Sequence, residues 1–234
     1  MRILLLLGLI ALVPACSPFG GADYWGNKSG PQGFRTVIID AGHGGKDSGA
    51  VSRHTGQKEK DANLDLAKRL RSELRGSFRT VMMRSDDRFV DLDERVKFAN
   101  RYRDAILVSL HFNSGSSSRR GPETYWWRVD SCGLALRCQR AMKSVSPYSN
   151  NAGLSRRRLR LTRNPAIPCV LLEGGYLSNS SEARQISSAD HRAKLAIAIA
   201  GAIREQTAKG DAGTGPRPRF IKAPPSRPTD APGS

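Results

Sequence analysis

The sequence predicts an α/β domain: a single twisted, mostly parallel but mixed sheet of about six strands, flanked by helices on both faces. Short apolar runs rich in β-branched residues alternate with longer segments of helical periodicity. A hydrophobic content of 38% suits a globular core. The 234 residues leave room for one domain of moderate size, and no internal repeat is visible. We therefore expect one folded domain, at residues 35–206.

Six short runs have the composition of strands, and helical patterns lie between several of them. The expected strands are residues 36–40, 80–83, 106–111, 124–127, 159–162 and 169–172. Strands that alternate with helices are typical of a largely parallel sheet with helices on both sides.

Four segments have the spacing of amphipathic helices. They are residues 59–76, 91–103, 131–145 and 188–206. The first places Ala62, Leu66 and Leu70 on one side and ends at Gly76. The second begins with Asp91 three residues before Glu94, which is the pattern of a capping box.

The first 15 residues are predicted to be a signal peptide. Arg2 precedes the apolar run "ILLLLGLIALV", which is too short to span a membrane as a helix. "VPAC" resembles the lipobox of bacterial lipoproteins, so we expect Cys16 to be lipidated, and Ser17 resembles the sorting position of outer-membrane lipoproteins. The predicted location is therefore periplasmic, with a lipid anchor in the outer membrane. Ordinary cleavage after Ala15 would instead give a soluble periplasmic or secreted protein.

Two flanking segments are predicted to lie outside the folded core. Residues 16–34 combine the lipidated N-terminus with a Gly-, Pro- and Ser-rich flexible tether. Residues 207–234 hold six of the 13 prolines and few apolar residues, which predicts a disordered basic tail.

The formal net charge of +17 falls mostly on the expected domain. A charge of this size attracts polyanions. The sequence contains no RNP-like, zinc-finger or helix-turn-helix signature, so we do not expect nucleic acid as a partner. An exported chain more plausibly meets anionic cell-wall polymer or lipid headgroups.

Three cysteines remain beyond Cys16. Cys138 lies at helical spacing among apolar residues, and Cys169 lies in an apolar strand, so both are expected in the core. Within one helix, Cys132 and Cys138 would have Cα atoms about 9 Å apart, too far for a disulfide. A disulfide between them requires Cys132 to precede the first turn.

Three of the expected strands end in residues that can do chemistry. His43 follows the first strand within "DAGHGG", His111 ends "ILVSLH", and Glu173 ends "PCVLLE". In α/β sheets, ligands and catalytic groups gather at the carboxyl ends of the strands. A glycine-rich turn with an exposed histidine is the alternative interpretation of "DAGHGG" taken alone.

These residues fit a catalytic zinc site. Such sites take three protein ligands, often two His and one Glu, and keep one position for water. His43 and His111 would supply the nitrogens, and Glu59, at the start of the first helix, is the natural third ligand. Glu173 would stand beside this water as general base. A half-buried acid is costly without a charged partner, which argues against a merely structural role for Glu173.

Six ordered blocks carry a resemblance to a known family. They are "VIIDAGHGGKDSGA", "EKDANLDLAKRL", "RSDDRFVDLDERVKFAN", "ILVSLHFNS", "GPETYWW" and "PCVLLEGGYLSN". The chain resembles the zinc-dependent N-acetylmuramoyl-L-alanine amidases of the bacterial cell-division type over about residues 36–206.

The resemblance implies both site and reaction. It implies that His43, Glu59 and His111 bind one Zn²⁺ and that Glu173 is the catalytic acid/base. The family hydrolyses the amide between the lactyl group of N-acetylmuramic acid and L-alanine of the stem peptide, so peptidoglycan is the expected partner. Ala41 replaces the usual proline before "GH", which should loosen the turn. Activator-controlled members insert a long helix between the "SLH" and "LLE" blocks; this interval is short here, so we expect an open site, no obligatory activator and a monomer.

Substrate contacts are less constrained by the sequence. The basic stretch "LSRRRLRLTRN" suggests that Arg156 and Arg163 bind stem-peptide carboxylates, although a solvated basic face is the alternative, and Asn113 is a third candidate. Of Trp126 and Trp127, at most one can line a groove. Two other functions stay open: a non-catalytic wall-binding lipoprotein, and a zinc peptidase acting within the stem peptide. No G-x-S-x-G elbow or P-loop supports serine hydrolysis or nucleotide binding.

Overall fold

A six-stranded mixed sheet forms the centre of the computed structural model, which describes residues 26–147, 149–150 and 152–216. The strands lie in the order β2-β1-β3-β6-β4-β5. Their bounds are β1 Thr36–Ala41, β2 Arg79–Met82, β3 Ala105–Asn113, β4 Glu123–Trp126, β5 Gly153–Arg156 and β6 Cys169–Tyr176. β1, β2, β3 and β6 are parallel, whereas β4 is antiparallel to β6 and parallel to β5. The predicted fold class is confirmed.

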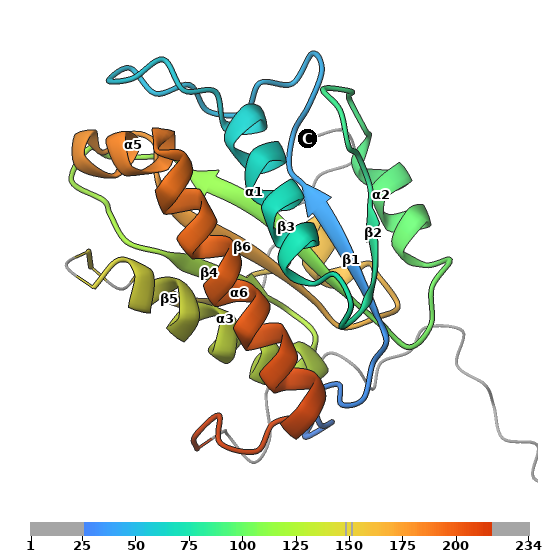
Figure 1. Ribbon diagram of the computed structural model, residues 1–234. Coiled ribbons are helices and arrows are strands. Elements are labelled where there is room, and N and C mark those ends of the chain that lie inside the picture. Colours follow the sequence, from blue (N-terminus) through green and yellow to red (C-terminus); the bar gives the residue numbers. More distant parts are fainter. Residues whose placement is uncertain (1–25, 148, 151, 217–234) are drawn as a thin grey trace, which may run out of the picture.

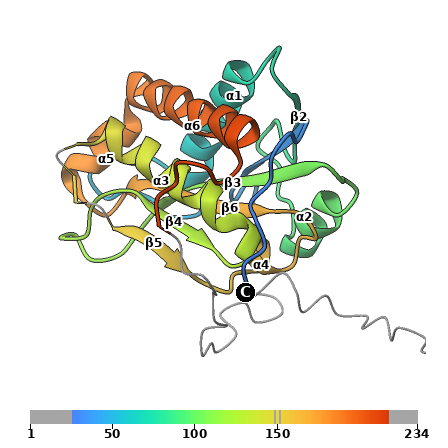
Figure 2. The same ribbon diagram turned by 90° about the horizontal axis from the view of Figure 1, so that it is seen from below.

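Helices cover both faces of the sheet, but unequally (Figures 1 and 2). The long helices α1, α3 and α6 lie on one face, and the short helices α2 and α4 lie on the other. The bounds are α1 Glu59–Glu73, α2 Leu92–Ala99, α3 Cys132–Val145, α4 Arg160–Arg163, α5 Ser180–Ser187 and α6 Ala189–Lys209. α5, which the sequence analysis missed, begins at the N-cap Asn179 and packs against β6 and α6.

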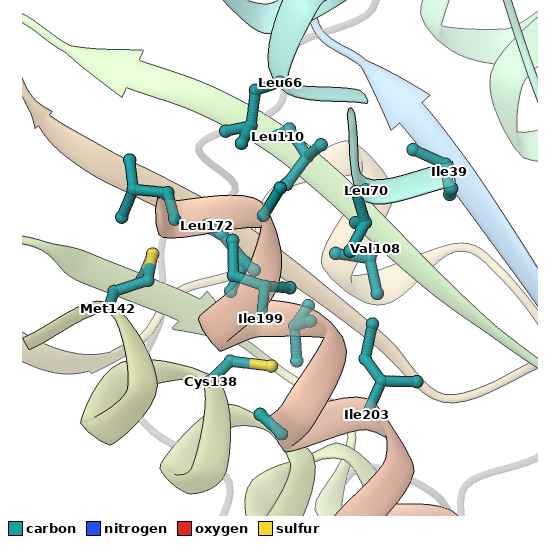
Figure 3. Packing of buried hydrophobic residues seen from close by; sticks show 14 of the residues in the cluster. Ile39, Leu66, Leu70, Val108, Leu110, Cys138, Met142, Leu172, Ile199 and Ile203 are labelled. Atoms are coloured by element: carbon teal, nitrogen blue, oxygen red, sulfur yellow. The ribbon is translucent and has the colours of Figure 1, made fainter. Parts of the chain in front are cut away.

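The first face carries the main core (Figure 3). Val108 and Leu110 of β3 alternate with residues of the opposite face and point toward α1 and α6. Leu70 of α1 and Ile199 of α6 are fully buried against them. Burying an aliphatic side chain of this size stabilises the fold by roughly 1.5–3 kcal/mol.

The second face has a smaller apolar cluster, formed where α2 and α4 cover the sheet. It includes Leu107 of β3 and Leu161 of α4. Because strand side chains alternate, Ser109 and His111 share this face with Leu107. Three of the site residues discussed below therefore point to the thinly covered side of the sheet: Asp40, His111 and Glu173.

One predicted strand is wrong. Residues 159–162 were expected to be a strand, but the fifth strand is β5 at Gly153–Arg156, and α4 begins at Arg160. The alternation of arginine with apolar residues resembles a strand, yet Thr162 accepts a hydrogen bond from the Leu159 amide and donates to the Arg157 carbonyl, which closes a helical turn. The side chain of Leu161, which lies in this turn, is buried.

The domain extends beyond both predicted ends. Residues 26–34 were assigned to the flexible tether and residues 207–216 to the disordered tail, but these parts pack on each other. The Gly33 amide donates to the Thr207 carbonyl, and the Gly30 amide donates to Asp211. Arg137 of α3 holds the carbonyls of residues 210 and 212. The predictions for residues 1–25, which include the signal peptide and Cys16, and for residues 217–234 lie outside the described residues.

Cys132, Cys138 and Cys169 are all buried, and no disulfide joins any two of these described cysteines. Cys132 is the first residue of α3, so the two Cα atoms of the considered disulfide lie within one helix, and the pair is not bridged. Within the described part of the chain, no helix combines the length and apolarity needed to cross a bilayer.

Candidate metal centre

The loop after β1 places His43 at the carboxyl edge of the sheet. His43 has a backbone φ of 61°, which is unusual for a residue with a side chain, and Gly44 and Gly45 follow with positive φ. Gly42 must lack a side chain, because a Cβ there would lie 2.1 Å from Cε1 of His111. The glycines of "DAGHGG" thus allow the loop to pass directly against the second histidine.

Three donor groups converge at this edge. His43 Nε2 lies 3.1 Å from Glu59 Oε1, and His111 Nδ1 lies 2.9 Å from the same oxygen. One donor atom from each residue lies within 4.8 Å of the others. Two imidazole nitrogens and one carboxylate oxygen at this separation fit a metal ion with three protein ligands. The structure therefore brings together the three residues predicted as ligands.

Glu59 is fixed in its ionised form. Its Oε2 accepts a hydrogen bond from the Ala50 amide at 2.9 Å, and its Oε1 accepts one from the Phe112 amide at 3.3 Å. Burial opposes ionisation, but hydrogen bonds from His111 and His43 outweigh it and hold the pKa of Glu59 well below its usual range. A carboxylate that is already ionised is ready to bind a cation.

Asp47 orients the first histidine. Its carboxylate lies 2.7 Å from His43 Nδ1, which leaves Nε2 directed at Glu59. Burial lowers the pKa of His43, but Glu59 and Asp47 together raise it to about 8. Such a carboxylate behind a ligating histidine is a common device for fixing the ring of a metal ligand.

Two buried arginines hold the carbonyl groups of the same loop. Arg95 of α2 donates to the carbonyls of Ala41 and His43 at 2.9 and 2.8 Å, and its charge pairs with the fully buried Asp40. Arg84 donates to the carbonyls of Ala41 and Gly42 at 2.8 and 2.9 Å. The sequence alone assigns no role to Asp40. The structure shows that it anchors Arg95, and that the turn at Ala41 is held firmly.

Glu173 lies beside the candidate metal ligands, on the strand next to that of His111. It pairs in register with His111 of β3 and points to the same face of the sheet. Its side chain is buried, and no described residue donates a hydrogen bond to Oε2. Burial, together with the nearby charges of Glu59 and Glu123, raises the pKa of Glu173 well above its ordinary value.

A groove of about 550 Å³ opens next to this centre on the second face. His43 and His111 form one end of its lining. Another part of the lining is Phe89, which precedes α2, and Leu92, the first residue of α2; both are partly exposed. Arg160 of α4 also lines the groove. Lys46 stacks over Phe89 at 4.6 Å, and Arg160 pairs with Asp93. The groove is therefore partly apolar, with charged groups of both signs.

The predicted substrate contacts are placed differently from one another. Asn113 lies at the end of β3, where its amide contacts Glu123 and Tyr125 at 3.3 and 3.4 Å. Arg156 instead packs over the buried rings of Trp126 and Trp127. Its lowered pKa, caused by burial, agrees with that structural role.

Arg163 does not line the groove either, since its Nε donates to the side chain of Asn164, and Arg160 occupies the wall instead. The helical turn of α4 explains why Arg160, and not Arg163, lines the groove. In a helix the two side chains do not alternate between the faces of a sheet, as they would in the predicted strand.

Sequence reasoning missed a second buried carboxylate. Glu123 of β4 lies opposite Glu173 and accepts hydrogen bonds from the hydroxyls of Tyr176 and Ser155 at 3.0 and 2.8 Å. Glu123 lies in the block "GPETYWW". It comes to the site through the antiparallel pairing of β4 with β6, which the sequence did not predict.

Comparison with known proteins gives a consistent family. A family model described as N-acetylmuramoyl-L-alanine amidase matches residues 37–205. The catalytic domain of CwlV, an N-acetylmuramoyl-L-alanine amidase from Bacillus (Paenibacillus) polymyxa var. colistinus, superposes with a TM-score of 0.70 at 37% identity, covering 73% of this chain and 97% of that domain.

Two curated relatives come from Bacillus subtilis (strain 168). The uncharacterized protein YqiI is 37% identical over 174 residues, which cover 72% of this chain and 83% of YqiI. The N-acetylmuramoyl-L-alanine amidase LytC is 34% identical over 172 residues, which cover 70% of this chain and 34% of LytC. The match therefore spans about a third of LytC but most of YqiI.

Proposed function

This chain belongs to the N-acetylmuramoyl-L-alanine amidase family, and from this premise we propose that it hydrolyses the amide between the lactyl group of N-acetylmuramic acid and L-alanine of the peptidoglycan stem peptide. The observation that carries the proposal is the convergence of His43, Glu59 and His111 on one point beside Glu173, whose Oε2 accepts no hydrogen bond from the described residues.

Zinc is the proposed metal. His43, Glu59 and His111 would hold it, because two neutral imidazoles and a carboxylate are a common ligand set of catalytic zinc. When bound, a zinc ion would supply Lewis acidity to the substrate carbonyl and lower the pKa of a water toward 7.

Glu173 is proposed as the general acid/base. Its raised pKa suits a group that must first accept a proton from the attacking water and then return it to the leaving nitrogen of L-alanine. The free Oε2 has no competing donor within the described residues, so it is available for both transfers. Asn113, at the end of β3, remains a proposed substrate contact.

Digestion of purified sacculi by the purified chain tests the proposal. We expect release of free stem peptides that begin with L-alanine, detected by mass spectrometry, and loss of the release when a chelator is added. Added zinc should restore it. Intact muropeptides would contradict the amidase, and fragments cut within the stem would favour the peptidase alternative. Binding without cleavage would favour the wall-binding lipoprotein.

The digestion of sacculi also tests whether the chain needs an activator protein. Between β3 and β6, the long helix α3 packs against α6 on the face opposite the groove, so it does not cover the metal ligands. We propose that the chain is active as a monomer without an obligatory activator. Activity that appears only after a partner protein is added would contradict this.

Zinc affinity is expected to fall as the pH drops below about 8. His43 must be neutral to bind metal, and its pKa of about 8 in the metal-free protein means that a proton competes below that pH. The dissociation constant should rise about tenfold per pH unit below this value, measured by competition with a chelating dye between about pH 6 and 9. Asp47→Asn should move the inflection to lower pH. A flat profile would contradict the assignment of His43.

The proposed site of action is the cell wall, reached by export. We propose that Cys16 carries a lipid anchor in the outer membrane, on the evidence of the "VPAC" pattern. Cells fed an alkyne-labelled fatty acid should label the wild-type chain but not Cys16→Ala, and the variant should become soluble. An unlabelled, soluble wild type would favour ordinary cleavage after Ala15, and equal labelling of both chains would show that the lipid is not on Cys16.

A further inference from the structure

Two arginines of the basic stretch at residues 156–163 reach the face of the sheet that carries the metal centre. Arg160 lines the groove, but its guanidinium is already paired with Asp93. Arg157 is exposed, and its guanidinium lies 5.5 Å from the centre of the Tyr125 ring. Within the described residues, no carboxylate lies at ion-pair distance from Arg157. Arg157 is therefore a cation whose charge is not neutralised by a local partner.

The position of Arg157 is fixed at its backbone and at its ring partner. Its amide donates to the Trp126 carbonyl at 2.9 Å, and its carbonyl accepts from the Thr162 hydroxyl at 2.7 Å. Tyr125 is 8% exposed, and its hydroxyl lies 3.4 Å from the amide nitrogen of Asn113. A guanidinium that lies over a held ring, on a backbone that is itself held, loses less freedom when it binds a ligand than an unrestrained one.

Tyr125 directs this guanidinium toward the catalytic acid. Tyr125 pairs with Leu171 across β4 and β6, so it lies on the face of Glu173 and diagonal to it. Diagonal neighbours in a sheet have Cα atoms about 7–8 Å apart, which is within reach of long side chains. The charge of Arg157 also partly opposes the rise in the pKa of Glu173 that burial and the neighbouring carboxylates cause.

The chemistry of this guanidinium favours a planar anion. The group lies over the Tyr125 ring without a described carboxylate partner, and its planar fork of N–H donors suits bidentate pairing with a carboxylate. We propose that Arg157 is a specificity-determining residue that binds a free carboxylate of the stem peptide, while Glu173 acts at the neighbouring amide. This inference rests on the proposed amidase function. The stem residue after L-alanine is a glutamate linked through its side chain, and its α-carboxylate is the nearest candidate.

A matched pair of soluble muramoyl peptides tests the proposal. The two substrates differ only in whether the glutamate α-carboxyl group is free or amidated. The full-length, zinc-loaded wild type should favour the free acid by roughly 10- to 100-fold in kcat/KM, the range expected for a charge-assisted hydrogen-bond pair. Arg157→Ala should lose that preference, because its kcat/KM should fall for the substrate with the free α-carboxylate and stay unchanged for the amidated substrate. Arg157→Lys should retain part of the preference, because it keeps the charge without the fork.

Arg101→Ala is the matched control. Arg101 is also exposed and also lies over an aromatic ring, 5.7 Å from the centre of Phe98, but it lies beyond the end of α2, away from the proposed metal ligands. This variant removes the same charge and should keep the wild-type preference. A similar loss of preference in Arg101→Ala would show that net charge, and not Arg157, selects the substrate.

Other results would overturn the proposal in distinguishable ways. Equal loss of activity on both substrates in Arg157→Ala would assign the residue to transition-state stabilisation or to folding, and not to specificity. A wild type without preference would also overturn it. If Arg157→Ala does not fold, Arg157→Gln and Arg157→Lys give the same comparison. Failure of the wild type to cut either substrate at the muramoyl amide would overturn the amidase function itself, and the inference with it.

Discussion

Replacing Glu173 with glutamine is expected to lower kcat by roughly 10²- to 10⁴-fold, the usual contribution of a general acid/base. Glutamine keeps the shape of the side chain but cannot accept and return a proton. The three metal ligands are untouched, so zinc stoichiometry should remain one per chain. The measurements are the rate of peptide release from sacculi and the zinc content of the purified variant.

Stability separates this loss of activity from a folding defect. In the metal-free protein, the raised pKa of Glu173 means that the fold favours the neutral acid, so its contribution is lost as the pH rises from the unfolded value toward the folded one. Glutamine carries no charge at any pH, and the metal-free variant should therefore be at least as stable as the wild type near pH 8. Glu73→Gln, at an exposed position of α1, should leave both properties unchanged. Full activity of Glu173→Gln would refute the assigned role.

Breaking the buried ion pair between Asp40 and Arg95 is expected to cost about 3–5 kcal/mol in the free energy of unfolding, because either single substitution leaves an uncompensated buried charge. Arg95→Ala also removes the donors to the carbonyls of Ala41 and His43. We therefore expect zinc affinity to fall about 10- to 100-fold, as for other groups that support a metal ligand from behind.

A double-mutant cycle isolates this pair. Asp40→Ala with Arg95→Ala should be less destabilising than the sum of the two single changes, measured by urea unfolding of the metal-free protein. Arg69→Ala is the comparison, because it breaks a half-exposed pair with Asp65 and should cost less than about 1 kcal/mol. Additive effects at positions 40 and 95 would show that the pair does not act as a unit.

The convergence of the three proposed ligands could be predicted because each follows a strong local pattern. His111 ends an apolar run, His43 follows another, and Glu59 opens an amphipathic helix, so one general rule about strand ends brings them together. The partner of Asp40 could not be predicted in this way. Arg95 lies 55 positions away on a helix whose docking side only the fold reveals.

The arginine stretch shows why the placement of individual arginines was harder to predict. Arg156 and Arg157 are adjacent and chemically identical, yet one packs against tryptophans and the other lies over Tyr125. The end of β5 and the turn of α4 decide between them, and the local pattern predicted a strand there instead. Glu123 was missed for the same reason, since its importance follows from the antiparallel pairing of β4 with β6.

The packing of residues 26–34 against residues 207–216 places both chain ends of the domain on the side opposite the candidate metal centre. Both segments lie near the amino end of β1, while the metal ligands lie at its carboxyl end. If Cys16 is anchored, only residues 17–25 separate the membrane from the folded domain, and an extended segment of this length reaches at most roughly 30 Å. The enzyme would then be held within that distance of the lipid surface, so that it reaches only the layer of the wall nearest the membrane to which it is anchored.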